Sequence, residues 1–261
     1  MPETRIKFHF QHGSAESGRL DLYDAGVSLE GIARTTAIIT HAYLNGGIRT
    51  RGDAAHGAKF YIRAPKQGSF LYEVVIWTGT AIAAGVFYDF TKYAIRETVG
   101  YFTSPDDEYA ALQKRIEPTI GELPAALEAP LDAVHRPIRR EPAIELDVTR
   151  PRGEKLAHLD KDSAAHLQLR TVTPPHPIVG NVTRYNTLTG WGRFYDRTEE
   201  RAVSFFLKES IPQDQRSLIT WSLHEANTGQ PGTLYIKGDA IVTPTDRIKR
   251  YAVKEISDVP F

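Results

Sequence analysis

The segment Gly180 to Asp196 constrains the fold more than any other part of this 261-residue chain. It reads GNVTRYNTLTGWGRFYD, two runs rich in β-branched and aromatic residues on either side of a polar segment. Such a pattern is typical of two antiparallel strands joined by a turn. Glycines on both sides of a tryptophan let a strand bend sharply, as strands in a small barrel must. The segment therefore predicts a strand, a turn and a second strand of a small β-barrel.

Short alternating runs continue through the rest of the C-terminal part. A helix is expected from about Pro212 to Glu225. The expected strands are Ile178 to Tyr185, Gly192 to Asp196, Ala202 to Leu207, Leu234 to Lys237 and Tyr251 to Ile256. Five short strands with one helix indicate a small five-stranded barrel of the OB or SH3 type, over residues 178–261.

Residues 1–149 have a different pattern, which predicts an α/β sandwich-like domain and makes the fold class α+β. Arg5 to Phe10 alternates like a strand, and Asp21 to Leu44 has apolar residues at helical spacing. That helix is expected to end at Asn45-Gly46-Gly47, where residues tolerant of positive φ can close its last turn. Lys59 to Arg63 and Phe70 to Trp77 flank a Pro-Lys-Gln-Gly turn and predict a hairpin.

Proline positions predict a helical arm after this hairpin. Ser104-Pro105-Asp106-Asp107 combines an N-cap hydroxyl with a first-turn proline, so a helix through Glu117 is expected. Prolines at 118, 124, 130 and 137 favour short helical pieces over one rod, because each removes an amide donor. We expect this arm to cover the sheet. The Pro- and Arg-rich residues 150–177 are typical of a linker with at most one short strand.

The most apolar stretch, Val74 to Phe87, is too short to cross a membrane, which takes about 20 apolar residues. Thr78-Gly79-Thr80 divides it into a strand-like half and a helix-like half, so a core strand followed by a core helix is expected. The alternative is a hydrophobic helix, Ala81 to Ile95, that is either re-entrant in a membrane or forms a self-association face. A homo-oligomer without a membrane contact is the corresponding prediction.

Composition limits the kind of partner. The chain has 32 Lys and Arg residues and 32 Asp and Glu residues, so contact with nucleic acid would depend on a local patch. The chain contains no cysteine, which excludes disulfides and thiolate chemistry and fits a reducing compartment. The N-terminus, MPETRIKFHF, lacks the features of a signal peptide, so a cytoplasmic location is expected.

The spacing Gly180-x-Val182-x-x-Tyr185-Asn186, followed by Gly190-Trp191-Gly192-x-Phe194, resembles the first half of a cold-shock domain over about 17 residues. That family is an OB-like barrel that binds single-stranded RNA and DNA. The resemblance places the family's outward aromatic positions on Trp191, Arg193, Arg184, Ser204 and Phe206, so two of five rings remain. Arginine planes can also stack on bases and pair with phosphate.

The expected nucleic-acid-binding residues share an aromatic or basic side chain. They are Arg184, Tyr185, Trp191, Arg193, Phe206, Lys249 and Arg250. The alternative is structural: Tyr185, Trp191, Phe194, Phe205 and Phe206 would be core or interdomain packing residues, the usual role of large aromatic side chains. Clusters such as Arg247, Lys249 and Arg250 are more often only a solvated strand edge that discourages strand pairing.

The architecture as a whole resembles a group of bacterial two-domain proteins of unknown function. The resemblance is carried by LYDAGVSLEGIAR, GSF, VHRPIRR and GWGRFYD. It implies the domain order and a bacterial cytoplasmic setting, and it transfers no catalytic residue.

Catalytic and metal candidates are few. His158, Asp160, Asp162 and His166 lie close together in HLDKDSAAH, but their spacing matches no standard metal site. His9 and His12 are expected on opposite faces of a strand. Asp53 and His56 could form an acid–base pair without an evident nucleophile, and Asp106, Asp107 and Glu108 fit a helix start. We therefore expect neither a metal nor a cofactor, and an enzyme ranks third.

Two functions remain open at this stage. The first is a non-enzymatic binding protein, whose barrel contacts single-stranded RNA or DNA or a nucleotide while the N-terminal domain mediates assembly. The second is an adaptor of a bacterial multiprotein complex, whose barrel docks on a protein partner.

Overall fold

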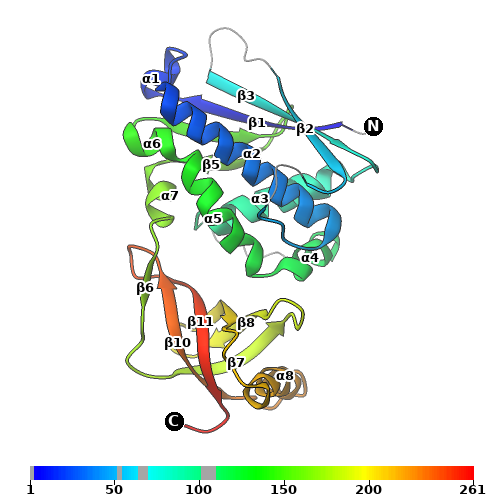
Figure 1. The fold of residues 1–261 in the computed structure, drawn as a ribbon, viewed down its shortest axis with the longest axis vertical. Helices are drawn as coiled ribbons and strands as arrows, with labels where there is room; N and C mark the ends of the chain where they lie inside the picture. The colour runs from blue at the N-terminus through cyan, green and yellow to red at the C-terminus, as the bar shows by residue number, and fades with distance from the viewer. Residues whose placement is uncertain (1–2, 52–54, 64–69, 101–109) are drawn as a thin grey trace. The chain divides into compact units, whose positions relative to one another are not determined.

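The computed structural model describes residues 3–51, 55–63, 70–100 and 110–261. The chain divides into two compact units, residues 1–167 and 168–261, each with its own hydrophobic core (Figure 1). The first unit combines a sheet with helices and the second contains a closed barrel. The α+β fold class is therefore confirmed.

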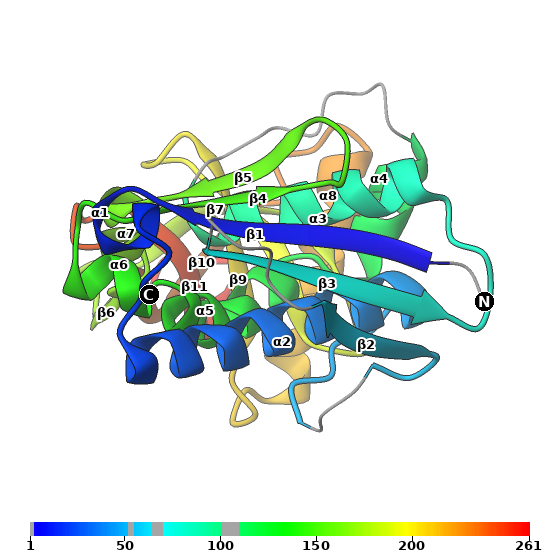
Figure 2. The ribbon, with the colours of Figure 1, turned by 90° about the horizontal axis from the view of Figure 1, so that it is seen from above.

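The first unit is built on a five-stranded antiparallel sheet in the order β2-β3-β1-β4-β5. Its strands are β1 (Glu3–Gln11), β2 (Ala58–Arg63), β3 (Phe70–Thr78), β4 (Glu145–Thr149) and β5 (Lys155–Leu159). Side chains alternate between the two faces of a strand. In β1, Ile6, Phe8 and Phe10 are buried against the helices, while the intervening residues lie on the opposite, open face. Figure 2 shows the strands lying over the helices.

Three long helices build the covered side: α2 (Leu22–Asn45), α3 (Ala84–Thr98) and α5 (Glu122–Val134). The carboxylate of Asp21 accepts hydrogen bonds from the backbone N–H groups of Tyr23 and Asp24, which caps α2. The helix ends at Gly46, with φ at 64°, as predicted. Gly31 lets α2 and α5 approach closely, because a Cβ there would lie 2.7 Å from the Pro130 carbonyl oxygen.

The apolar stretch Val74 to Phe87 forms the end of β3 and the start of α3, which confirms the prediction of a strand followed by a helix. Phe87, Phe90 and Ile95 of α3 are buried in the core of the first unit. The apolar side of α3 is therefore used inside its own unit, and the expected self-association face on this helix is not formed. Among the described residues, no helix is both long and apolar enough to cross a membrane.

The proline-rich region consists of short helices, as predicted. They are α4 (Ala110–Ile116), the 3-10 helix η1 (Glu117–Thr119), α5 and α6 (Arg136–Arg140). We predicted that the arm covers the sheet; its longest helix, α5, instead packs against α2 and α3 and so belongs to the helical layer of the first unit. The expected helix start at Ser104 to Asp107 lies outside the described residues. β2 and β3 pair as a hairpin from Ala58↔Thr78 to Arg63↔Glu73, and its turn also lies outside them.

The expected linker, 150–177, differs from the structure in its first half. β5 pairs with β4, and α7 (Lys161–His166) follows it, so both belong to the first unit. Asp160 caps α7 by accepting hydrogen bonds from the backbone N–H groups of Asp162 and Ser163. Proline and arginine in this region mark the β4–β5 turn instead of a flexible connection. The two units divide between Leu167 and Gln168.

The second unit is a closed barrel whose topology is OB-like. Its elements are β6 (Arg170–Val172), β7 (Ile178–Tyr185), β8 (Trp191–Asp196), β9 (Arg201–Leu207), α8 (Gln213–Asn227), β10 (Leu234–Val242) and β11 (Ile248–Ser257). β7, β8 and β9 form an antiparallel meander, β10 pairs with β7 and β11, and β11 closes the barrel by parallel pairing with β9. β6 adds to β10. The predicted five strands and one helix are confirmed.

Candidate nucleic-acid interface

The outer face of β8 and β9 presents the aromatic and basic side chains of the Gly180 to Asp196 segment. In β8, Gly192 and Phe194 point into the barrel and are buried, whereas Trp191, Arg193 and Tyr195 alternate with them and are partly or fully exposed. In β9, Ala202, Ser204 and Phe206 lie opposite Tyr195, Arg193 and Trp191, respectively, although the side chain of Ser204 is buried among its neighbours. None of these six outer residues is acidic. We call them the β8–β9 face.

Trp191 and Phe206 form a ring pair on this face. They are cross-strand neighbours, and their ring centroids lie 5.0 Å apart with an interplanar angle of 34°. Both side chains are only partly buried. An aromatic pair of this kind offers a flat apolar platform on which a planar ring can stack.

A row of arginines crosses the barrel beside this ring pair. Arg184 of β7 lies opposite Arg193 of β8, which lies opposite Ser204 of β9. Arg250 of β11 is in register with the same serine. The four positions therefore form one line over four strands, two residues along β8 from Trp191. A β-bulge between Val182 and Arg184 turns Arg184 to the outside.

Tyr195 is a member of the face that the sequence analysis did not select. Its side chain is 39% exposed, and it follows Trp191 and Arg193 at the next outward position of β8. Period-two alternation along the strand was the signal that could have identified it. The strand thus shows Trp, Arg and Tyr on one side.

Two of the expected binding residues lie elsewhere. Tyr185 is opposite Gly192, and its ring stacks on buried Phe205 with an interplanar angle of 6°, so it packs against the barrel core. Burial raises the pKa of its hydroxyl. Lys249 occupies a register shift between β10 and β11, outside the arginine row. The structural alternative holds for Phe194 and Phe205, which are buried in the core.

Gly192 allows β8 to pass close to the barrel core. A Cβ at this position would lie 2.5 Å from the Arg184 carbonyl oxygen and 2.6 Å from the Phe205 ring. The inner ring of Phe205 can therefore approach β8 only because residue 192 has no side chain. The tightly curved strand is held from inside by Tyr251, whose hydroxyl donates a 2.5 Å hydrogen bond to the Asp196 carboxylate.

The HLDKDSAAH residues have separate structural partners. Nδ1 of His158 lies 2.8 Å from Oδ1 of Asp147, on the open face of the first unit's sheet. Burial raises the pKa of Asp147, but hydrogen bonds from Lys155, His158 and Gln11 outweigh it and hold this pKa below its usual range. In the part of the chain that the structure describes, no group of three His, Asp or Glu side chains could hold a metal ion.

The remaining catalytic candidates do not form a site in the described residues. Asp53 and Asp106 to Glu108 lie outside them. His56 is exposed, and its backbone N–H donates a hydrogen bond to Nδ1 of His41. His9 projects from the open face of the sheet, and Nε2 of His12 lies 3.6 Å from Glu145.

A serine–histidine pair that the sequence analysis missed lies in the first unit. Nε2 of His135 is 3.0 Å from the Ser163 hydroxyl, and Nδ1 donates a 2.6 Å hydrogen bond to the Leu131 carbonyl. Both side chains are buried, and burial lowers the pKa of His135 to about 4. A pair that no substrate can reach has a structural role, here in joining α5 to α7.

These features define a two-domain protein with an aromatic and arginine-rich face on an OB-like barrel. Two family profiles match the chain. The one described as "Domain of unknown function (DUF7946)" matches residues 6–136, and the one described as "Family of unknown function (DUF7947)" matches residues 174–257. The chain belongs to the DUF7946 family. No curated protein and no solved structure matches it.

Proposed function

We propose that the protein is a single-stranded nucleic-acid-binding protein that holds RNA or DNA on the β8–β9 face. The observation that carries the proposal is the Trp191–Phe206 ring pair beside the row of Arg184, Arg193 and Arg250. Bases stack on aromatic platforms irrespective of their identity, and arginine pairs with the phosphates between them. The two kinds of contact occur here on one surface.

The position of the face within the barrel supports the same reading. OB barrels bind oligonucleotides on the face of their second and third strands, which are β8 and β9 in this unit. The equal numbers of acidic and basic residues in the whole chain do not oppose it, because the face itself carries no carboxylate. A cytoplasmic setting in a bacterium is part of the proposal, since a chain without cysteine suits a reducing compartment.

The test is a titration of the full chain into fluorescent single-stranded RNA and DNA at low and moderate salt. We expect saturable binding that weakens as salt rises, because arginine–phosphate contacts release counterions. The double variant Trp191→Ala with Arg193→Ala removes one ring and one guanidinium. It should bind about 30-fold or more weakly, since stacking alone contributes about 1 to 3 kcal/mol per base.

Trp221→Ala is the matched control. Trp221 is a 40% exposed tryptophan of the same unit, but it lies on α8 and not on the β8–β9 face. This control should bind like the parent, and the melting temperatures of all variants should agree within a few degrees. Equal binding by the double variant and the parent would refute the site.

An adaptor function is the second candidate, and one observation favours it. Leu188, in the turn between β7 and β8, is 94% exposed, and a protein partner that docks on this turn would remove its apolar side chain from water. Leu188→Ser should abolish capture of a protein partner while leaving nucleic-acid binding unchanged. A strict monomer in light scattering, with no partner captured by the parent, would count against this function.

A further inference from the structure

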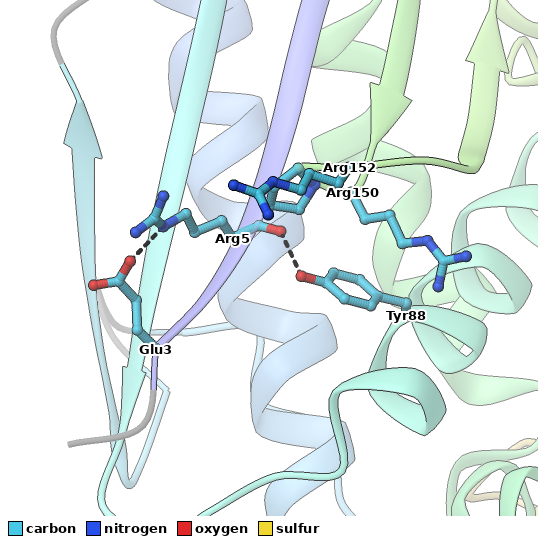
Figure 3. A pocket seen from close by; sticks show the side chains of 6 residues that line it. Glu3, Arg5, Tyr88, Arg150 and Arg152 are labelled. Carbon is cyan, nitrogen blue, oxygen red and sulfur yellow. Dashed lines mark hydrogen bonds and ion pairs between the residues drawn. The ribbon is translucent and has the colours of Figure 1, made fainter.

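The first unit contains an open pocket of about 600 Å³ beside the N-terminal end of β1, the central strand of its sheet. It is lined by Glu3, Arg5, Tyr88, Arg150, Pro151 and Arg152. Figure 3 shows Glu3 and Arg5 on β1, Tyr88 on α3, and the two other arginines on the segment that follows β4. The pocket is far along the chain from the β8–β9 face and belongs to a different unit.

The strand register explains why the pocket exists. β1 pairs with β4 only from Lys7 to Gln11, so β4 does not cover the first residues of β1. At that point the chain leaves β4 and turns back into β5 through residues 150–154. The Lys7 ammonium donates a 3.4 Å hydrogen bond to the Pro151 carbonyl and holds this turn near β1. The Tyr88 hydroxyl donates a 3.0 Å hydrogen bond to the Arg5 carbonyl and forms the floor.

The lining is predominantly cationic, with three guanidinium groups and one carboxylate. Arg5 is committed to carboxylates: it forms an ion pair with Glu3 and lies 3.7 Å from Glu73. Hydrogen bonds from Arg5 and then from Trp77 lower the pKa of Glu3, so this carboxylate stays charged at neutral pH.

The other two arginines are less constrained. A 3.5 Å ion pair joins Arg150 to Glu154, and its Nε has no hydrogen-bond partner among the described residues. Arg152 is exposed, and in the described part of the chain its side chain makes no hydrogen bond or ion pair. The buried Nε of Arg150 is a donor that an anion in the pocket could satisfy, and within the described residues the exposed Arg152 guanidinium has no protein carboxylate to compete with such an anion.

We propose that this pocket binds the phosphate group of a small phosphate monoester, with Arg152 and Arg150 as the principal ligands. The planar guanidinium fork matches the geometry of phosphate oxygens, and in the part of the chain that is described Arg152 has no carboxylate partner with which a phosphate would compete. The volume is within the range of small-molecule sites and exceeds what an inorganic ion needs, so the ester's organic part has room.

Calorimetric titration of the full chain with glycerol 3-phosphate tests the proposal, with inorganic phosphate and glycerol as comparison ligands. Glycerol 3-phosphate should bind saturably, phosphate more weakly, and glycerol not at all. Arg152→Ala should weaken glycerol 3-phosphate binding by about tenfold or more, because it removes a charge-assisted bidentate contact. Arg34→Ala is the control, since Arg34 is an exposed arginine of α2 outside the pocket.

Glu3→Gln should strengthen ligand binding, whereas Arg152→Ala should weaken it. Removing this carboxylate abolishes its repulsion of the ligand and leaves Arg5 with Glu73 as its remaining acidic neighbour, so glycerol 3-phosphate should bind several-fold more tightly than to the parent. If the arginines had only a structural role, Glu3→Gln would not increase the affinity for glycerol 3-phosphate. The pair of variants thus separates a ligand site from a site whose loss only perturbs the fold.

A second experiment tests whether the phosphate group belongs to a nucleic-acid end or to a soluble ester. Tetranucleotides with a 5′-phosphate and with a 5′-hydroxyl are titrated into the Trp191→Ala with Arg193→Ala variant, which lacks the proposed barrel site. A preference for the 5′-phosphate that Arg152→Ala removes supports a nucleic-acid end as ligand, whereas binding of glycerol 3-phosphate alone supports a soluble ester. Absence of saturable binding by every phosphate compound, or equal affinity of Arg152→Ala and parent, would overturn the proposal.

Discussion

The open face of the first unit's sheet and the β8–β9 face of the barrel are both outward sides of antiparallel strands, but their chemistry differs. On the open face, basic residues alternate with carboxylates: Glu73 lies within 4 Å of both Arg5 and Arg63, and Asp147 contacts Lys155 and His158. On the β8–β9 face, one arginine lies between aromatic rings and no carboxylate is present.

The difference shows how the same two-residue alternation can produce either a self-neutralised surface or a receptive one. A carboxylate placed across from each cation supplies the counter-charge within the protein, which makes an external anion compete. Aromatic neighbours place flat apolar surface beside a guanidinium, so an arginine among them suits a ligand that is both planar and anionic. The net charge of the entire chain does not reveal this contrast, because it sums the charges of both faces.

The largest expected effect comes from the glycine that shapes the barrel face. Gly192→Ala should lower the free energy of unfolding of the second unit by about 2 to 4 kcal/mol, because its Cβ would overlap the Arg184 carbonyl oxygen and the Phe205 ring. Gly26→Ala in α2 is the contrasting variant: its Cβ meets nothing within 4 Å, so it should stabilise the helix by about 0.5 to 1 kcal/mol. Urea denaturation measures both, and equal effects would show that the barrel is not tightly closed at Gly192.

The two units should differ in how their stability changes as the pH falls. The pKa of buried His135 is lowered to about 4 in the folded state, so the unfolded chain binds more protons between pH 6.5 and 4, and the first unit loses up to about 3 kcal/mol over that range. In the barrel, hydrogen bonds from Lys254 and then Lys208 outweigh burial and lower the pKa of Asp239 to about 2. The ionised Asp239 carboxylate therefore contributes its full stabilisation of the barrel above pH 3.8. This stabilisation is lost only as the pH falls toward 2.

Thermal melts at pH 7, 5 and 4, followed by separate probes in each unit, check this order. His135→Gln should make the melting temperature of the first unit less dependent on pH, and it should leave the melting temperature of the barrel unchanged. A barrel that melts before the first unit as the pH falls from 6.5 to 4 would contradict the assignment.

A smaller effect concerns the residue that extends the β8–β9 face. Tyr195→Ala should weaken binding of single-stranded nucleic acid about fivefold, less than loss of Trp191, because Tyr195 has no ring opposite it: its partner on β9 is Ala202. Tyr61→Ala, an exposed tyrosine on the open face of the other sheet, should leave nucleic-acid binding unchanged. Fluorescence anisotropy measures both, and the reverse order would move the interface to the first unit.

The smallest effect is expected on the self-neutralised face. Glu73→Gln should change the free energy of unfolding by only about 0.5 to 1 kcal/mol, since its ion pairs with Arg5 and Arg63 are long, at 3.7 and 3.9 Å, and both arginines also contact Glu3. The difference should shrink further at high salt. A loss of several kcal/mol in urea titrations would mean that this face depends on its ion pairs and is less similar to a solvated surface than we describe.

Strand and helix positions could be predicted where periodicity and turn residues agree, as in α2, the β2–β3 pair and the barrel meander. The prediction failed where a segment's role depends on distant pairing: β5 joins the first sheet because β4 lies beside it, which composition rich in proline and arginine conceals. For the site, the resemblance to a cold-shock domain placed Trp191, Arg193 and Phe206 at outward positions, and the structure has them on one face. The resemblance could not reveal that Tyr185 stacks inward on Phe205, since a bulge at residue 183 reverses the outward phase.

The most direct test of the β8–β9 face uses Trp191 as its own reporter. The chain has three tryptophans, so Trp77→Phe with Trp221→Phe leaves Trp191 as the only one. Titration of this variant with a single-stranded oligonucleotide should quench the indole fluorescence saturably, and added salt should reverse the quenching as base stacking on Trp191 is lost. Oligonucleotide binding at the parental affinity without any change in Trp191 fluorescence would contradict the account.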